Sequence, residues 1–376
     1  MDYCLITGMA RSGTTLLEKM LNSHPQMSLL SQPMPLLYRH LKSEFYARIG
    51  YPDTYYVLND LFHEFRYSQD DFFSFLENYE MSVEKLRTIF EEMEDWTGQW
   101  EDIKFEEIHF KEHNPQHFIR LYKNFLQRIL DAEFKILGSK EVLVEEFVPY
   151  MVQNGVRVVL VIRDPRDVIT SLNVGRGPDF AGAHRPTLFH LRNWRRSTAV
   201  ANSVIGSYNF LVIRYEDLIT QPYSTLSKVT DFLDIQNFAN DHFENGIKSE
   251  YGNVWKGNSS TNKFRKVDPN NKNKFKKYLS TDTIKYIEYI CHPEMDLWGY
   301  DLHHSELSSY DPISFKEPYD IQVDDLNSDM STDHHEIELE VKRKKLLKQQ
   351  TSSEDRIISF FYSEKNYQSL KKTMGG

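Results

Sequence analysis

The chain has 376 residues, of which 40% are hydrophobic and 14% aromatic, and this composition excludes wholesale disorder. Its 45 Lys and Arg residues against 55 Asp and Glu residues give a formal net charge of −10. That balance excludes the broad cationic surface of a nucleic-acid coat or a basic membrane-surface protein. The only two cysteines, Cys4 and Cys291, cannot build a disulfide framework or a cysteine metal cluster, which favours a reducing compartment.

No apolar run approaches the roughly 18 residues of a membrane span. The first apolar segment starts almost at Met1, so we expect neither a signal peptide nor an N-terminal anchor. The sequence therefore predicts a cytoplasmic protein without a membrane span and without a nucleic-acid partner.

Short β-branched runs predict buried parallel strands, and longer amphipathic stretches between them predict covering helices. The predicted strands are Tyr3–Thr7, Phe134–Gly138, Arg157–Ile162 and Phe210–Arg214. This alternation is typical of an α/β fold with three layers, in which helices flank a central parallel sheet.

Two regions depart from this alternation. Residues 36–132 have a helical period and predict a helical insertion over the strand ends, with a plain packing layer as the alternative. Residues 301–376 carry 15 acids and 10 bases, segregated along the chain, which indicates a charged C-terminal extension. We therefore expect a main domain over residues 1–300 and an extension over residues 301–376.

The strongest local pattern is the segment GMARSGTT, residues 8–15, which follows the first predicted strand and opens a helix. Gly8 and Gly13 allow the backbone to wrap around an anion, and successive amides with the helix N-terminus supply positive potential. An ATP-type loop has lysine where Thr14 stands here, and the cation is instead Arg11. This pattern predicts a phosphate-binding loop and disfavours a P-loop kinase, which stays an alternative.

The loop resembles that of the sulfotransferases that use 3′-phosphoadenosine 5′-phosphosulfate (PAPS), which reads [KR]-S-G-T-T. The continuation LLEKMLNSHP, residues 16–25, is similar to the tyrosylprotein branch and its bacterial relatives. The resemblance implies a P-loop-type fold, with PAPS as co-substrate and 3′-phosphoadenosine 5′-phosphate (PAP) as product. It also implies that the 5′-phosphosulfate is bound by five loop residues: Arg11, Ser12, Gly13, Thr14 and Thr15.

A second segment, RDPRDVITS, resembles the 3′-phosphate site of the same family. Arg163 ends a predicted strand and Ser171 follows eight residues later, so a guanidinium and a hydroxyl can face the same phosphate oxygens. The alternative is a surface ion pair of Arg163 with Asp164. Tyr215, in a Y-E-D segment, resembles the family's tyrosine near the adenine, with a plain buried tyrosine as the alternative.

In-line sulfuryl transfer requires positive charge on the transferring group and a base for the acceptor. Arg11 can serve the bridging oxygen, and Lys140 resembles the family's lysine at the transferring group, with a solvated lysine as the alternative. The resemblance implies no essential metal, and no acidic cluster in the sequence demands one.

The catalytic base is the weakest part of the resemblance. Gln32 stands where the tyrosylprotein branch has a glutamate, and Val142 stands where the cytosolic enzymes have a histidine. Glu141 is the first candidate, unless it only pairs with a neighbouring cation, and His184 is the second.

These features predict transfer of a sulfuryl group from PAPS to a hydroxyl or amine. The acceptor class stays open among small molecules, sugars, lipid-like compounds and peptides, and we expect the helical insertion on the acceptor side. The alternatives are an inert PAPS- or PAP-binding protein, because Gln32 replaces the expected base, and a P-loop nucleotide kinase.

Overall fold

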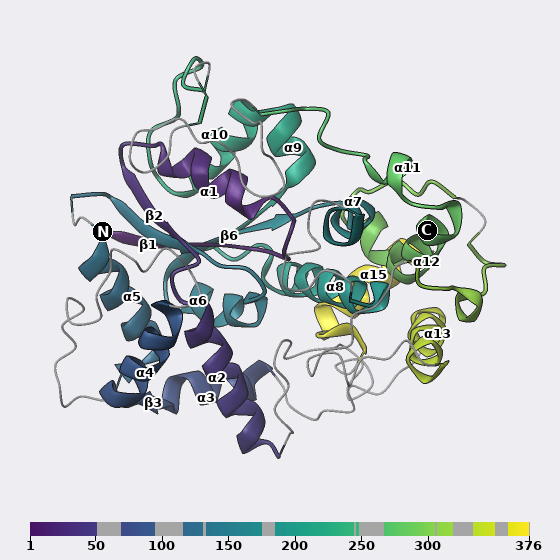
Figure 1. The fold of residues 1–376 in the computed structure, drawn as a ribbon, viewed down its shortest axis with the longest axis horizontal. Coiled ribbons are helices and arrows are strands. Elements are labelled where there is room, and N and C mark those ends of the chain that lie inside the picture. The colour runs from purple at the N-terminus through teal and green to yellow at the C-terminus, as the bar shows by residue number, and fades with distance from the viewer. Residues whose placement is uncertain are drawn as a thin grey trace.

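The computed structural model describes residues 1–50, 69–94, 116–130, 133–174, 185–243, 246–247, 267–304, 307–318, 334–349 and 360–375. Its centre is a parallel sheet of five strands in the order β2-β5-β1-β6-β7 (Figure 1). The strands are β1 (Asp2–Thr7), β2 (Met27–Ser31), β5 (Ile136–Lys140), β6 (Val156–Ile162) and β7 (Phe210–Arg214). The predicted α/β fold with a central parallel sheet is confirmed.

Helices cover both faces of the sheet (Figure 1). One face carries α1 (Thr14–Asn22), α9 (Tyr215–Thr220) and α10 (Pro222–Phe232), and the other carries α5 (Phe118–Ile129), α6 (Val148–Gln153) and α8 (Thr187–Val204). Alternate side chains of β1 enter opposite layers, since Leu5 packs in one hydrophobic cluster and Cys4 and Ile6 in the other. The period of two along a strand therefore explains both layers.

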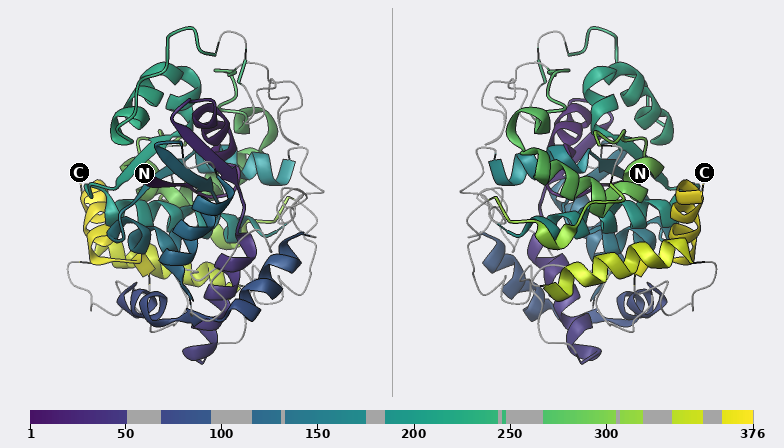
Figure 2. Two further views of the ribbon diagram at one scale, coloured as in Figure 1. Left: turned by 90° about the vertical axis from the view of Figure 1, so that its left-hand side faces the viewer. Right: turned by 90° about the vertical axis from the view of Figure 1, so that its right-hand side faces the viewer.

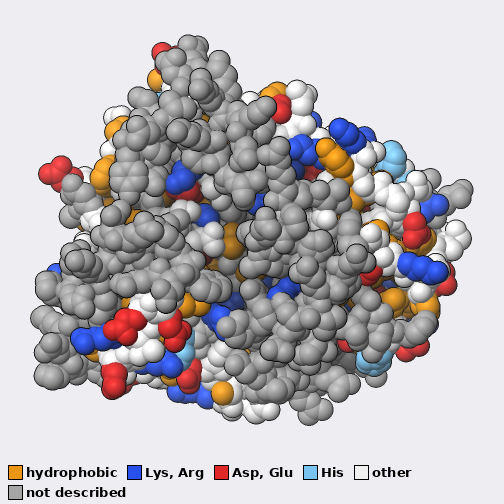
Figure 3. Space-filling view, viewed as in Figure 1, with side chains coloured by type: hydrophobic (Ala, Val, Ile, Leu, Met, Phe, Trp, Pro, Cys, Tyr) orange, Lys and Arg blue, Asp and Glu red, His pale blue; other side chains and the backbone are white. Residues whose placement is uncertain are grey.

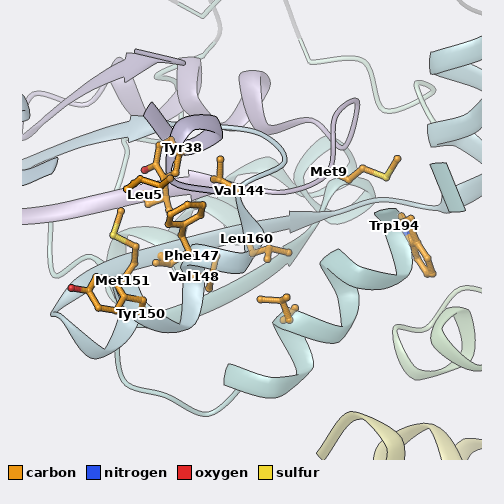
Figure 4. Close-up of a cluster of buried hydrophobic side chains, with 14 of the residues drawn as sticks. Leu5, Met9, Tyr38, Val144, Phe147, Val148, Tyr150, Met151, Leu160 and Trp194 are labelled. Carbon is orange, nitrogen blue, oxygen red and sulfur yellow. The ribbon is translucent and has the colours of Figure 1, made fainter. Parts of the chain in front are cut away.

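Edge-to-face aromatic contacts anchor the larger hydrophobic cluster. The Tyr38 ring lies 4.8 Å from the Phe147 ring and 5.5 Å from the Phe118 ring, both nearly perpendicular to it. Figure 4 shows the cluster extending from Tyr150 on α6 to Trp194 on α8. The cluster therefore packs residues of β1 and α2 together with residues of α6 and α8.

The region predicted as a helical insertion is mainly helical where the structure describes it. It contains α2 (Pro35–Arg48), α3 (Gln69–Asn78) and α4 (Val83–Glu94), with an antiparallel pair of short strands, β3 (Glu80–Met81) and β4 (Gln116–His117). In α4 the buried side chains Leu86, Ile89, Phe90 and Met93 recur at helical spacing. The position of this region on the acceptor side stays a prediction.

Five further helices pack against α8 or against its neighbouring helices, and Figure 2 shows the last two of them in yellow-green and yellow. They are α7 (Pro165–Ile169), α11 (Phe275–Tyr278), α12 (Thr281–Leu297), α13 (His334–Lys348) and α15 (Glu364–Gly375). Short helical turns complete the fold at η2 (Glu145–Phe147), η3 (Thr170–Val174) and η4 (Pro312–Ser314).

The described part of the C-terminal extension packs against the main body. Helix α15 contacts α8 and α12, and α13 buries Glu340 and Arg343 in its inner face. Some of the charged side chains that led us to predict an extension are thus buried inside the protein. The domain boundary at residue 300 stays a prediction. Among the described residues, no helix combines the length and the apolar character needed to cross a bilayer.

Candidate nucleotide site

The predicted site residues meet at one edge of the sheet, where the parallel strands end. The loop of residues 8–13 follows β1, Lys140 is the last residue of β5, Arg163 follows β6 and Tyr215 follows β7. Parallel strands bring their carboxyl ends together, so segments that are far apart in sequence become neighbours.

Two glycines shape the phosphate loop. Gly13 has a φ of 97°, and a Cβ there would lie 2.3 Å from Cδ2 of Tyr215. A Cβ at Gly8 would lie 2.4 Å from the carbonyl oxygen of Val161. Only a glycine permits these close approaches, so the loop lies tightly between β6 and Tyr215.

The loop leads directly into α1, whose N-terminus faces the site. Gly13 is the N-cap and provides no side-chain cap, and the first turn of α1 holds no acidic residue. The first amide N–H groups of a helix have no partner within the helix and attract anions. The N-terminus of α1 is therefore suited to hold a phosphate or sulfate group.

The two predicted nucleotide motifs touch each other. Arg11 donates a hydrogen bond from Nε to Oγ of Ser171 at 3.0 Å, and Arg163 donates one to the carbonyl oxygen of Arg11 at 3.0 Å. These contacts join residues 160 and 152 positions apart. The structure thus brings Arg11, Arg163 and Ser171 together, as the sequence predicted.

Tyr215 lies against Arg163, and its hydroxyl has a partner that the sequence did not suggest. The guanidinium of Arg163 lies 4.4 Å from the centre of the Tyr215 ring, and Asn271 donates from Nδ2 to the Tyr215 hydroxyl at 2.6 Å. The Asn271 carbonyl also accepts a hydrogen bond from Arg163 at 3.4 Å. Asn271 belongs to no motif, so only the fold could reveal it.

The residues present suit a polyanion. Among the described residues, Ser12 Oγ and Arg163 Nε are buried without a hydrogen-bond partner. Arg163 binds the backbone of Arg11, and burial together with the neighbouring charge of Arg163 lowers the pKa of Arg11. Unsatisfied buried donors and adjacent like charges are costly unless an anion engages them. The donor set therefore fits a phosphate-bearing nucleotide.

The backbone of Arg163 is fixed by its surroundings. Asp164 is the N-cap of α7, and its carboxylate accepts hydrogen bonds from Nε and Nη2 of Arg166 at 2.9 and 2.6 Å. Arg166 also donates a hydrogen bond from Nη1 to Oε1 of Glu288 at 2.5 Å. Trp194 donates from Nε1 to the carbonyl oxygen of Arg163 at 2.7 Å. Asp164 thus pairs with Arg166, which leaves the Arg163 guanidinium directed at the loop.

Lys140 lies beside Gln32 at the end of the neighbouring strand. Lys140 donates from Nζ to Oε1 of Gln32 at 2.9 Å, and only 2% of its surface is exposed. Burial lowers the pKa of Lys140, while the carboxylates of Glu18 and Glu141 oppose that shift. This buried lysine is not the solvated strand-end lysine of the alternative interpretation.

Glu141 directly follows β5 and lies next to Met34, the residue before α2. Its Oε1 accepts a hydrogen bond from the Met34 amide at 2.8 Å, and it is 1% exposed. Burial raises the pKa of Glu141 to about 8, against the lowering influence of the Met34 amide and Lys140. A carboxyl group with such a pKa can exchange a proton near neutral pH.

Other predicted residues have varied outcomes. Thr14 and Thr15 open α1, and Thr14 is buried. His184 lies outside the described residues. The described residues hold no group of three or more His, Cys, Asp or Glu side chains that could bind a metal ion.

Two family models match segments that build this site. A model described as "Sulfotransferase family" matches residues 4–54, and one described as "Sulfotransferase domain" matches residues 189–299. The first match contains the phosphate loop and Gln32, and the second contains Trp194, Tyr215 and Asn271. Two separate segments of the chain, both of which contribute to the site, are therefore similar to sulfotransferases. The tyrosylprotein branch stays a prediction, because neither match distinguishes it.

Several solved structures are similar to this chain. A sulfotransferase domain from the curacin biosynthetic pathway is 19% identical, with a TM-score of 0.40, and the match covers 80% of this chain and 98% of that one. A sulfotransferase domain from the olefin synthase of Synechococcus PCC 7002 is 17% identical, with a TM-score of 0.42 and coverage of 75% and 89%. A mouse sulfotransferase complexed with PAP is 13% identical, with a TM-score of 0.39 and coverage of 78% and 84%. No curated protein matches this chain.

Proposed function

We propose that the protein transfers a sulfuryl group from PAPS to a hydroxyl or amine of an acceptor by in-line displacement. The observation that carries this proposal is the contact of Arg11 with Ser171 and of Arg163 with Arg11, which unites the predicted 5′-phosphosulfate and 3′-phosphate motifs. The buried and unpartnered Ser12 hydroxyl supports it, since that group needs an acceptor such as a phosphate oxygen.

The roles of the nucleotide-binding residues follow from their chemistry. PAPS, when bound, supplies a sulfuryl group on a good phosphate leaving group. The amides at the start of α1, with Ser12, Thr14 and Thr15, bind its 5′ end. Arg163 and Ser171 bind the 3′-phosphate, and Tyr215 packs beside the adenine.

The catalytic roles belong to the residues around Gln32. Arg11 and Lys140 place positive charge where negative charge develops on the leaving and transferring oxygens. Glu141 removes the acceptor proton, with His184 as the second choice, and Gln32 orients the acceptor. Sulfuryl transfer here requires no metal ion in the proposed mechanism.

A second candidate function is nucleotide binding without transfer. One observation favours it: Lys140 donates its hydrogen bond to Gln32, at the position where the related branch carries a glutamate base. A glutamine cannot accept the acceptor proton as a carboxylate does. The two functions share the nucleotide site and differ only at the base.

A transfer assay separates these two functions. Labelled PAPS is incubated with small hydroxyl and amine compounds, sugars, lipid-like alcohols and tyrosine peptides, and the label is followed onto each acceptor. We expect transfer to one of these classes by the wild-type protein and by Lys135→Met, but not by Lys140→Met. Lys135 is the matched control, because it immediately precedes the same strand and pairs with exposed Asp234 at 2.9 Å. PAP binding without transfer to any acceptor class would favour the inert alternative.

The proposed partner is therefore a small-molecule, sugar, lipid-like or peptide acceptor. A cytoplasmic location remains part of this proposal, supported by two buried, unpaired thiols at Cys4 and Cys291.

A further inference from the structure

We propose that helix α13 belongs to the nucleotide site, and that Glu340 is a positioning residue that acts on Arg163 through α8 and Trp194. This inference rests on the proposed function, because it assumes that Arg163 binds the 3′-phosphate. It gives the C-terminal extension a role that its sequence did not indicate.

The first contact in this chain of interactions is between Trp194 and Arg163. Trp194 is 1% exposed, and its Nε1 donates to the carbonyl oxygen of Arg163 at 2.7 Å. The Tyr300 ring packs edge-on against the indole at 6.4 Å. A buried indole with a single donor fixes the peptide that it binds. The direction in which the Arg163 side chain leaves the strand therefore depends on where α8 holds Trp194.

The second contact is between α8 and α13. Arg192 donates from Nε to Oε1 of Glu340 at 2.8 Å, and Arg195 donates to both oxygens of Glu340 at 2.5 and 2.8 Å. Residues three apart lie on one face of a helix, so one carboxylate holds both arginines across a turn. These arginines flank Trp194 in the sequence. The turn of α8 that carries the indole is therefore held by Glu340, together with Glu336, which pairs with Arg192 at 2.5 Å.

The charge of Glu340 is required for this arrangement. Glu340 is 3% exposed, and although burial opposes ionisation, Arg195 and Arg192 hold its pKa below the ordinary value. Without the carboxylate, buried Arg195 loses its hydrogen-bonded ion pair and Arg192 keeps only its pair with Glu336, which is a large perturbation. We expect the turn of α8 to move in order to relieve this unpaired charge, and Trp194 to move with it.

The same helix provides a matched control. Arg343 of α13 forms an equally buried ion pair with Glu294 of α12, and Glu294 is 1% exposed. This second ion pair holds α13 against α12 rather than α8. Glu294→Gln and Glu340→Gln therefore each remove one buried carboxylate that holds α13 in place. Of the two, only Glu340 forms hydrogen bonds with the arginines that flank Trp194.

The test measures the ratio of affinities for PAP and for adenosine 5′-phosphate by calorimetry, at a temperature where each full-length variant is folded. We expect Glu340→Gln to reduce this ratio by about fivefold or more, within the usual range of coupling between sites. Glu294→Gln should leave the ratio at its wild-type value even if it lowers the melting temperature equally.

A second pair of variants tests the indole directly. Trp194→Phe should also reduce the ratio, because it removes the donor to Arg163 and keeps an aromatic ring. Trp298→Phe is its control, since Trp298 Nε1 is buried without a partner among the described residues.

The outcomes distinguish the inference from the proposed function. An unchanged ratio in Glu340→Gln or in Trp194→Phe overturns the inference, as does an equal loss in Glu294→Gln. A wild-type protein that does not prefer PAP over adenosine 5′-phosphate overturns the proposed function itself.

Discussion

At the scale of single residues, Arg163 is held from several directions and yet keeps a buried Nε without a partner among the described residues. Its side chain contacts the Arg11 carbonyl and the Tyr215 ring, and its backbone is bound by Trp194. A guanidinium fixed in this way is prepared to bind a phosphate with little loss of side-chain entropy.

Arg163→Ala should weaken PAP binding by about 10- to 100-fold, because a hydrogen bond to a charged group contributes roughly 1.5–3 kcal/mol. Binding of adenosine 5′-phosphate should change little, since that nucleotide lacks the 3′-phosphate. Calorimetry with both nucleotides measures the difference. Arg157→Ala is the control, because Arg157 lies at the other end of β6 and pairs with Asp2 at 3.1 Å. Equal losses for both nucleotides would remove Arg163 from the 3′-phosphate site.

Glu141→Gln tests the assignment of the base. Loss of a general base reduces turnover by about 10²- to 10⁴-fold, whereas the nucleotide contacts should remain intact. The turnover number and the PAP affinity of the variant are measured together. If turnover survives and His184→Ala loses it instead, His184 is the base.

The same variant has a predicted effect on stability. The folded state raises the pKa of Glu141 from 4.5 to about 8, so the folded protein keeps a proton that the unfolded chain releases in this range. Wild-type stability contributed by this group is therefore lost as the pH rises through that window. As the pH rises from 5 to 8, the free energy of unfolding of Glu141→Gln should therefore increase relative to that of the wild type, by up to about 1.4 kcal/mol per pH unit. Denaturant unfolding at pH 5, 6.5 and 8 measures this difference in free energy. A difference that does not change with pH contradicts the raised pKa.

Motif spacing predicted the residues that we propose for nucleotide binding, but not the residues that hold these side chains in place. Arg11, Arg163 and Ser171 lie in short segments whose spacing reflects the chemistry of phosphate binding. Asn271 is 56 positions from its partner Tyr215, so no local pattern connects the two. Contacts of this kind depend on the tertiary fold, which brings separate loops to one sheet edge.

At the scale of elements, the turn from β1 into α1 combines a required backbone shape with a close contact. Gly13 needs a positive φ, and the Tyr215 ring occupies the space where a side chain would lie.

The strands were predictable because β-branched runs are typical of buried parallel sheets. The edge strand β2, with the sequence MSLLS, was not predicted because it is short and contains two serines.

Gly13→Ala should destabilise the fold and weaken PAP binding, because the new methyl group displaces Tyr215. Gly206→Ala is the matched control, since Gly206 has a similar φ of 92° and no atom within 4 Å of the added Cβ. The left-handed backbone alone costs about 1–2 kcal/mol for an alanine. Denaturant unfolding should show a larger loss at Gly13 than at Gly206, and equal losses contradict the described contact.

At the scale of the whole molecule, the net charge of −10 does not oppose an anionic ligand, because the cations of the site are local. Acidic and basic side chains of the described residues are interspersed on the face in Figure 3. Composition predicted the absence of a broad basic surface, but it could not show that Arg192, Arg195 and Arg343 are buried with carboxylates. Charge segregation along the sequence does not reveal which side of a helix faces inwards.

A chain that ends at Tyr300 should lose most of its stability. The truncation removes Glu340, which leaves two buried arginines without their shared carboxylate, and a broken buried pair costs roughly 3–5 kcal/mol. This cost approaches the typical free energy of unfolding of a whole domain, about 5–15 kcal/mol. Thermal unfolding followed by circular dichroism measures the change. A truncated protein that unfolds at the full-length temperature would show that the extension is independent.

The central claim is that the loop of residues 8–15 and the segment of residues 163–171 form one site for a 3′-phosphorylated adenine nucleotide. Calorimetric titration of the full-length protein with PAP and with ATP tests this claim most directly. The account predicts that PAP binds at least about tenfold more tightly, since Arg163 and Ser171 face the 3′-phosphate and Thr14 replaces the lysine of an ATP site. ATP binding as tightly as PAP, or more tightly, would contradict it.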